Sequence, residues 1–169
     1  MTCTLATLEA EPADGPPATT KGHTMSVTTT THLNFRGQAR EALELYASIF
    51  GGQVLAFTYG DAHVDIDGAV PDQLMWGGFE SPNGLSLMAF DVPPERPFDR
   101  GQDAVFVSVR SEDPDEITRC FEVLAVQGNV RTPLGPAPWG TPLYGMLDDR
   151  FGITWVMDVA VDQVSDGPA

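Results

Sequence analysis

His32 and Asn34 are two polar residues that could take part in chemistry, and they stand two positions apart in a segment with alternating apolar residues. Successive side chains of a strand point to opposite faces, so Leu33 and Phe35 would face a core while His32 and Asn34 point away from it together. An imidazole and an amide on one face can hydrogen-bond a small polar molecule, and an imidazole can also ligate a metal ion. His32 is therefore either a metal ligand or a hydrogen-bonding residue of a metal-free pocket.

A second polar cluster is the sequence DAHVDIDG over residues 61–68. Its spacing is similar to part of a calcium-binding loop, but Leu74 stands where such a loop needs a bidentate glutamate. The other interpretations are a solvated acidic loop between two strands and a lid over a cleft. Of the three, we expect the solvated loop.

Aromatic side chains recur along the predicted strands, and aromatic walls with few polar groups are the usual lining of a small-molecule pocket. Trp155 and Phe151 lie at a predicted hairpin and are expected to fill the core. Trp139 and Tyr144 lie in a segment rich in glycine and proline at a strand edge, where a ligand could reach them. The residues expected to bind a ligand are His32, Asn34, Trp76, Phe106, Trp139 and Tyr144.

The elements that would position these residues occur twice along the chain. A strand over 28–35 precedes a helix over 37–50, which Gly51 and Gly52 would end. A strand over 104–110 precedes a second helix, in which Asp113 is expected to be the N-cap, Pro114 the first helical residue and Glu116 the partner in a capping box. Three strands are predicted after each helix, at 53–59, 73–80 and 85–90 and then at 129–134, 143–147 and 153–159. The sequence therefore predicts two βαβββ modules.

Two longer motifs flank this repeat. They are HLNFRGQAREALELY over 32–46, followed by IFGG over 49–52, and WGTPLYGMLDDRFGITW over 139–155. Together they resemble the PhnB-like branch of the vicinal-oxygen-chelate (VOC) superfamily, which includes glyoxalase I, extradiol dioxygenases and bleomycin-resistance proteins. The resemblance covers residues 30–159. It implies an α+β fold in which two βαβββ modules form a half-open eight-stranded barrel-like sheet with a central cleft, and it implies a homodimer.

The resemblance also implies where a metal ion would be bound. Metal-dependent relatives hold an octahedral ion with His, Glu or Gln from four strands, and the ion acts as a Lewis acid on two vicinal oxygens of the substrate. The corresponding positions are His32, Trp76, a residue near Ala104 or Phe106, and Val156. Only His32 can coordinate, so we expect neither a metal ion nor another cofactor.

These observations favour one function over two others. The first is binding of a small organic ligand in a metal-free aromatic cleft, for sequestration or resistance. The alternatives are a metal-dependent lyase, isomerase or dioxygenase of the glyoxalase type, and a partner-binding module without a pocket. Some members of the branch are described as demethylubiquinone methyltransferases, but we recognise no methyl-donor site, nucleophile elbow, Walker loop or dinucleotide-binding turn in this sequence.

Composition narrows the class of partner. Nine basic residues against 24 acidic ones give a formal charge of −15, which disfavours nucleic acid and anionic membranes as partners and favours planar or cationic organic molecules over phosphorylated ones. No run reaches the ~18 apolar residues of a membrane span. The two cysteines, Cys3 and Cys120, form no disulfide framework, which is consistent with a cytoplasmic protein.

The ends of the chain differ from the repeat. Residues 1–24 lack periodicity and are predicted to be a disordered extension, with Met25 as an alternative start. Residues 25–161 would form the domain, with modules at about 28–91 and 103–159, and residues 162–169 a polar tail.

Overall fold

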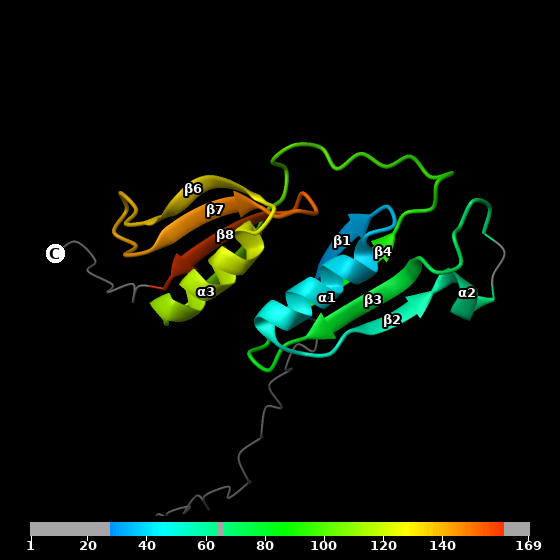
Figure 1. The fold of residues 1–169 in the computed structure, drawn as a ribbon, viewed down its shortest axis with the longest axis horizontal. Helices are drawn as coiled ribbons and strands as arrows, with labels where there is room; N and C mark the ends of the chain where they lie inside the picture. Colours follow the sequence, from blue (N-terminus) through cyan, green and yellow to red (C-terminus); the bar gives the residue numbers. More distant parts are fainter. Residues whose placement is uncertain (1–27, 64–65, 161–169) are drawn as a thin grey trace, which may run out of the picture.

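The structure is a computed structural model that describes residues 28–63 and 66–160. The predicted extension at 1–24 and tail at 162–169 lie outside the described residues, as does Asp65 of the acidic segment. The described residues form two βαβββ modules of an α+β fold, joined by a connection over residues 92–106 (Figure 1).

Module 1 contains β1 (Thr31–Phe35), α1 (Ala39–Phe50), β2 (Leu55–Thr58), α2 (Tyr59–Ala62), β3 (Leu74–Glu80) and β4 (Ser86–Asp91). Module 2 contains β5 (Val107–Ser111), α3 (Pro114–Ala125), β6 (Asn129–Gly135), β7 (Tyr144–Asp148) and β8 (Thr154–Val159). The strand orders are β1-β4-β3-β2 and β5-β8-β7-β6, so the eight strands form two four-stranded sheets that are not closed into a barrel. In each sheet the first strand of the module pairs in parallel with the last one, and the other pairs are antiparallel.

The predicted alternation along β1 is confirmed. Leu33 and Phe35 are buried beneath α1, whereas His32 and Asn34 are exposed on the opposite face of the sheet. We call the sheet face away from the module's own long helix its open face. The open face of module 1 therefore presents the two side chains that the sequence marked for chemistry.

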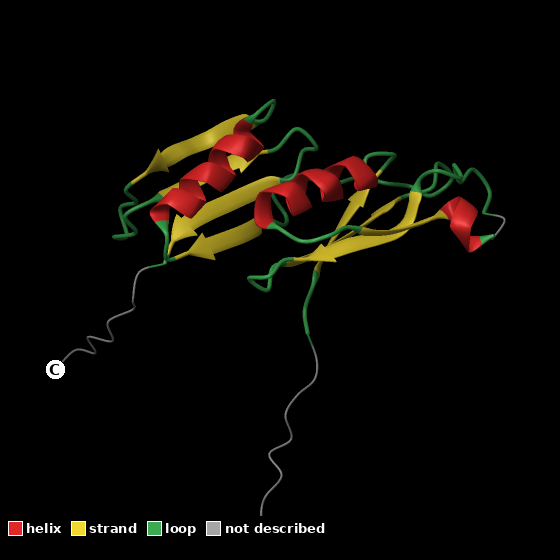
Figure 2. Ribbon diagram, turned by 60° about the horizontal axis from the view of Figure 1, so that its bottom comes forward, coloured by secondary structure: helices red, strands yellow, loops and turns green. Residues whose placement is uncertain are grey.

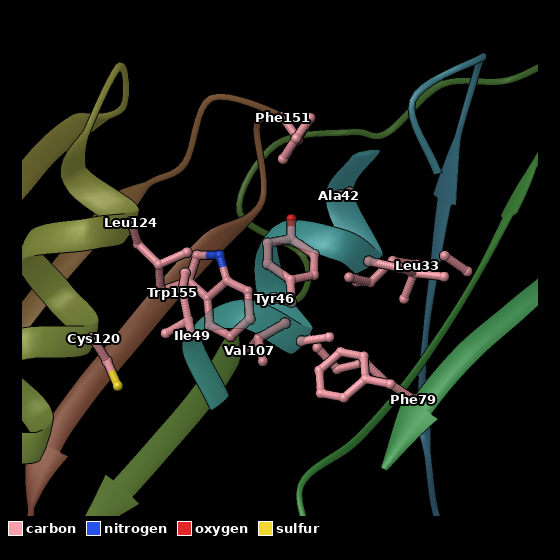
Figure 3. Close-up of a cluster of buried hydrophobic side chains, with 14 of the residues drawn as sticks. Leu33, Ala42, Tyr46, Ile49, Phe79, Val107, Cys120, Leu124, Phe151 and Trp155 are labelled. Carbon is pink, nitrogen blue, oxygen red and sulfur yellow. The ribbon is translucent and has the colours of Figure 1, made fainter. Parts of the chain in front are cut away.

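The two long helices lie side by side at the junction of the sheets, as Figures 1 and 2 show. Their buried side chains repeat at helical spacing, including Leu43 and Tyr46 on α1 and Cys120 and Phe121 on α3. One cluster of buried side chains runs through both modules. Figure 3 shows Tyr46 and Trp155 near its centre, between residues of module 1 and residues of α3. The two modules thus share a core, and Trp155 and Phe151 fill it as expected.

Some local predictions need correction. The strand predicted at 104–110 begins only at Val107, so Phe106 belongs to the connection. The long strand predicted at 53–59 ends at Thr58, where a capping box with Asp61 starts the short helix α2. Asp113 is the N-cap of α3 and Pro114 follows it, as predicted.

The capping box expected at the start of α3 does not form, because Ser111 lies between its partners. The Ser111 hydroxyl donates to Glu116 Oε2 at 2.7 Å and accepts a hydrogen bond from the Asp113 N–H at 3.1 Å. The Asp113 carboxylate accepts from the Asp115 N–H at 2.9 Å. The cap of α3 is therefore formed by residues next to it in the sequence.

Among residues 28–63 and 66–160, no helix has both the length and the apolar character needed to cross a bilayer.

Candidate ligand-binding site

A cavity of about 550 Å³ lies between β1 of module 1, the connection, and the start of β8 in module 2. Arg131 of β6 also lines it, so the wall comes from four parts of the chain that are distant in sequence. The side chains most relevant to binding are His32, Asn34, Phe98, Arg100, Arg131 and Thr154.

β1 contributes His32 and Asn34 to this cavity. The parallel register with β4 places Asn34 beside Phe90, and the His32 ring lies edge-on to Phe90 with 5.6 Å between the ring centroids. Edge-to-face contacts of this kind orient a ring without using its nitrogen atoms. Since no described residue forms a hydrogen bond with the side chain of His32 or of Asn34, both side chains are available to a ligand.

The connection forms a second wall, which arginine side chains hold in place. Arg36 Nη2 donates to the Arg96 carbonyl at 2.8 Å. The guanidinium groups of Arg36 and Arg100 lie 5.8 and 5.9 Å from the Phe98 ring centroid, within the range of cation–π attraction. The connection is thereby fixed to the end of β1.

Arg100 also reaches module 2. Its guanidinium donates to the Phe151 carbonyl in the turn between β7 and β8. The next turn residue is Gly152, with φ of 78°, and a Cβ there would lie 2.6 Å from Arg100 Nη1. Glycine is needed at this position both for the left-handed backbone and for the approach of Arg100.

Arg131 on β6 forms the polar end of the cavity. Its guanidinium pairs with Asp148 on β7 at 2.7 Å and with Asp103 of the connection. Burial opposes ionisation of Asp148, but hydrogen bonds from Arg131, Thr154 and Asn129 outweigh it and hold the pKa of this carboxyl below its usual value. Arg131 is therefore a fixed, already neutralised charge that also links the connection to the sheet of module 2.

The six predicted ligand-binding residues are not all brought together. His32 and Asn34 line the cavity. Trp76 lies on β3 opposite Phe57 on the open face of module 1, and Phe106 directly precedes β5. Trp139 packs edge-on against Tyr144 of β7, with 4.9 Å between the ring centroids. These four aromatic residues lie outside the cavity wall.

Sequence reasoning did not predict the part of the wall that lies outside β1. Arg100 and Phe98 belong to a stretch with no periodicity, which gave no sign that it would fold back over β1. Arg131 and Thr154 lie in predicted strands, at 129–134 and 153–159, and the sequence predicts neither as a ligand-binding residue. The only signal available was the turn glycine Gly152, and nothing in the sequence pairs it with Arg100.

The donor set does not fit the divalent ion that the fold family implies. His32 is the one imidazole in the wall, and its carboxylates are already engaged, since Asp103 pairs with Arg131 and Asp99 accepts from the Gly101 N–H at 2.9 Å. In the part of the chain that the structure describes, no three His, Cys, Asp or Glu side chains gather closely enough to hold a metal ion. An octahedral ion needs more protein ligands than these residues supply.

Comparison with known proteins gives a consistent assignment. A family model described as 3-demethylubiquinone-9 3-methyltransferase matches residues 27–157. A protein of known structure from Pseudomonas aeruginosa is 32% identical, with a TM-score of 0.72, over 81% of this chain and 100% of its own. A PhnB protein from Bacillus cereus, which carries the same methyltransferase description, is 28% identical over 79% of this chain and 100% of its own, with a TM-score of 0.67.

More distant similarity is a similarity of fold. A glyoxylase/bleomycin resistance protein/dioxygenase domain from a Frankia strain is 16% identical and has a TM-score of 0.56, over 82% of this chain and 100% of its own, which shows a shared fold. A comparison with curated protein sequences finds no match. Since the family model spans most of the sequence and the fold agrees, the chain belongs to the PhnB-like family described as 3-demethylubiquinone-9 3-methyltransferase.

Proposed function

We propose that the protein binds a small organic molecule in the cavity beside His32, without a metal ion, and serves in sequestration or resistance. The observation that supports this most directly is the pair of unengaged side chains, His32 and Asn34, projecting from one strand face into a cavity of about 550 Å³. Ligand pockets fall in the range of about 300–1,000 Å³ and use a few placed polar groups for orientation. Phe98 supplies apolar surface in the cavity wall, and Phe90 orients the His32 ring from beside it.

The proposal includes a homodimer, because aromatic side chains are left exposed on the open face of module 1 and, at Trp139, in the loop between β6 and β7. Phe57 is 45% exposed, Trp76 39% and Trp139 64%. Large apolar residues gathered on a rigid sheet face are typical of an interaction surface. A second copy of this chain would cover them and bring further aromatic surface towards the cavity. Sedimentation analysis of the wild type and of Trp76→Glu tests this, and a wild type that is monomeric at micromolar concentration contradicts it.

The ligand site is tested by isothermal titration of the full chain with two sets of probes, cationic planar aromatics such as acridine orange and phosphorylated metabolites such as fructose 1,6-bisphosphate. We expect acridine orange to bind and His32→Ala to weaken binding by about tenfold, the effect of one lost hydrogen bond. His63→Ala is the matched control, because His63 is exposed and lies outside the cavity wall. Binding of the phosphorylated probe alone, or equal effects of the two histidine variants, would show that the site is misassigned.

A second measurement separates this proposal from the enzymatic alternative. Elemental analysis of protein purified without chelator is expected to find no stoichiometric transition metal, because His32 has no partner ligands. About one Zn, Ni, Mn or Fe per chain, lost in His32→Ala, would instead support a metal-dependent lyase, isomerase or dioxygenase.

A further inference from the structure

A second cavity, of about 530 Å³, lies at the junction of the modules and shares no lining residue with the His32 cavity. Its floor is apolar and comes from both modules. Phe50 and Leu85 approach from module 1, and Val109, Ile117 and Cys120 from module 2. Ile117 and Cys120 are 1% and 2% exposed, so the floor reaches the shared core.

The rim of this second cavity carries unbalanced negative charge. Arg110 is its one cationic residue, and Asp158 neutralises it through two hydrogen bonds of 2.9 and 2.6 Å. Glu112 and Glu116 also line the cavity, and neither forms an ion pair with a described residue. Glu116 accepts only the Ser111 hydroxyl, at 2.7 Å. An apolar floor with two unpaired carboxylates at its rim matches a molecule with an apolar body and a positive end.

The cavity follows from the internal repeat. β5 and the β3–β4 turn form the wall here, and β1 and the β7–β8 turn form the wall of the His32 cavity. The repeat therefore places one cavity on each side of the junction. The connection over 92–106 covers the first one with Arg100, whereas Glu112 and Glu116 stand at the rim of the second.

We propose that this second cavity, defined by Phe50, Ile117, Glu112 and Glu116, is a separate binding site for small organic cations such as quaternary ammonium compounds. The apolar floor would take up the body of the cation, and the two carboxylates would stabilise its charge without removing a strong hydration shell. Residues 161–169, which follow β8, contain Asp162 and Asp166 and no basic residue, so their charge does not match this rim.

The probe is benzyltrimethylammonium, compared with the neutral isostere neopentylbenzene and with the anion phenylacetate. The readout is the rate at which methyl methanethiosulfonate modifies Cys120, followed by intact mass in a Cys3→Ser background. The ammonium compound is expected to slow modification of Cys120 at concentrations where phenylacetate has no effect and neopentylbenzene a smaller one. Equal protection by the neutral isostere, or none by the cation, contradicts the proposal.

Variants then test the charge. Glu112→Gln with Glu116→Gln is expected to raise the Kd for benzyltrimethylammonium by about tenfold, the sum of two partly exposed ion pairs. The matched control is Glu122→Gln, which removes an exposed carboxylate of α3 outside the cavity. Because Glu116 also bonds Ser111, the single variant Glu112→Gln is measured separately and should weaken binding by itself. His32→Ala should leave this binding unchanged, so failure of one site does not imply failure of the other.

Discussion

In both modules a glycine on the sheet lets the long helix pack closely, but the N-terminus of that helix is capped in different ways. In module 1 a Cβ at Gly77 would lie 2.9 Å from a Leu43 methyl on α1, and in module 2 a Cβ at Gly145 would lie 2.7 Å from the Phe121 ring on α3. Glycine on the third strand of each module therefore lets the helix approach closely. Both modules therefore have a glycine at the strand position where the helix packs closest to the sheet.

The helix starts show the difference. Gln38, the N-cap residue of α1, makes no side-chain cap, and the buried carboxylate of Asp91 takes over from the end of β4. It accepts from the N–H groups of Gly37 at 2.6 Å, Ala39 at 3.0 Å and Leu74 at 3.0 Å. In α3 the neighbouring Asp113 does this work locally. Module 1 thus caps its helix with a residue that is distant in sequence, whereas module 2 caps its helix with a neighbouring residue.

The junction between the modules is also asymmetric. Tyr46 on α1 donates to Asp149 Oδ2 at 2.6 Å, and Trp155 Nε1 donates to the same oxygen at 2.8 Å. Asp149 Oδ1 accepts from the N–H groups of Phe151 and Ile153. This buried carboxylate is fully hydrogen-bonded and joins α1 to the β7–β8 hairpin. The hydrogen bond that α3 makes to module 1 is donated by Arg119 to the Ile49 carbonyl, at 3.2 Å.

The largest effect is expected from Asp91→Ala. The substitution leaves three buried or half-buried N–H groups without an acceptor and should lower the free energy of unfolding by about 3–5 kcal/mol. Urea denaturation measures this directly. A loss below that of Asp113→Ala would show that the tertiary cap is not the stronger one.

Gly145→Ala tests whether glycine is needed where the helix packs closely on the sheet. The added methyl group meets the rigid Phe121 ring, so we expect a loss of about 2 kcal/mol from overpacking, and a smaller loss for Gly77→Ala, which meets flexible leucine methyl groups. Gly135→Ala on β6 is the control, because nothing lies within 4 Å of a Cβ there. Thermal unfolding of the three variants compares them. Equal stability of Gly145→Ala and Gly135→Ala would contradict close helix–sheet contact.

Tyr46→Phe removes one of four donors to Asp149 and should cost about 1–2 kcal/mol. Burial, together with the charge and hydrogen bond of Asp149, raises the pKa of the Tyr46 phenol. Since its folded pKa exceeds the unfolded value of about 10, the contribution of Tyr46 is complete below pH 10 and is lost as the pH rises above it.

The pH profile gives this prediction its control. Urea unfolding at pH 8 and at pH 10.5 should show a smaller difference between wild type and Tyr46→Phe at the higher pH. Tyr59 also has a raised pKa but is present in both proteins, so its contribution cancels. A constant difference at the two pH values would show that the Tyr46 phenol does not stabilise the junction in its protonated form.

The smallest effect is expected from Asp113→Ala. Loss of an exposed N-cap costs about 1 kcal/mol, and the Ser111 and Glu116 hydrogen bonds near the first turn remain. The ratio between this value and that for Asp91→Ala, measured by the same denaturation experiment, expresses the difference between the modules. A loss as large as that of Asp91→Ala would remove the contrast.

The sequence by itself determined the structural features that depend on residues close together in the chain. The alternation of Leu33 and Phe35 with His32 and Asn34, the N-cap at Asp113 and the hairpin closed by Gly152 are all written within a few positions, so periodicity and turn chemistry predict them. The repeat of such segments was enough to predict two βαβββ modules. Element boundaries moved by a few residues, because strand ends are decided by pairing partners.

The tertiary structure alone decided the cap by Asp91, the junction at Asp149 and the wall formed by Arg100. Asp91 is 52 residues from Ala39 along the chain, and Asp149 is 103 residues from Tyr46. Arg100 is 51 residues from Phe151. No local pattern relates residues at such distances, since any of several aspartates or arginines could meet these groups until the sheets and helices are packed. Both cavities belong to this class, because their walls come from segments that only packing brings together.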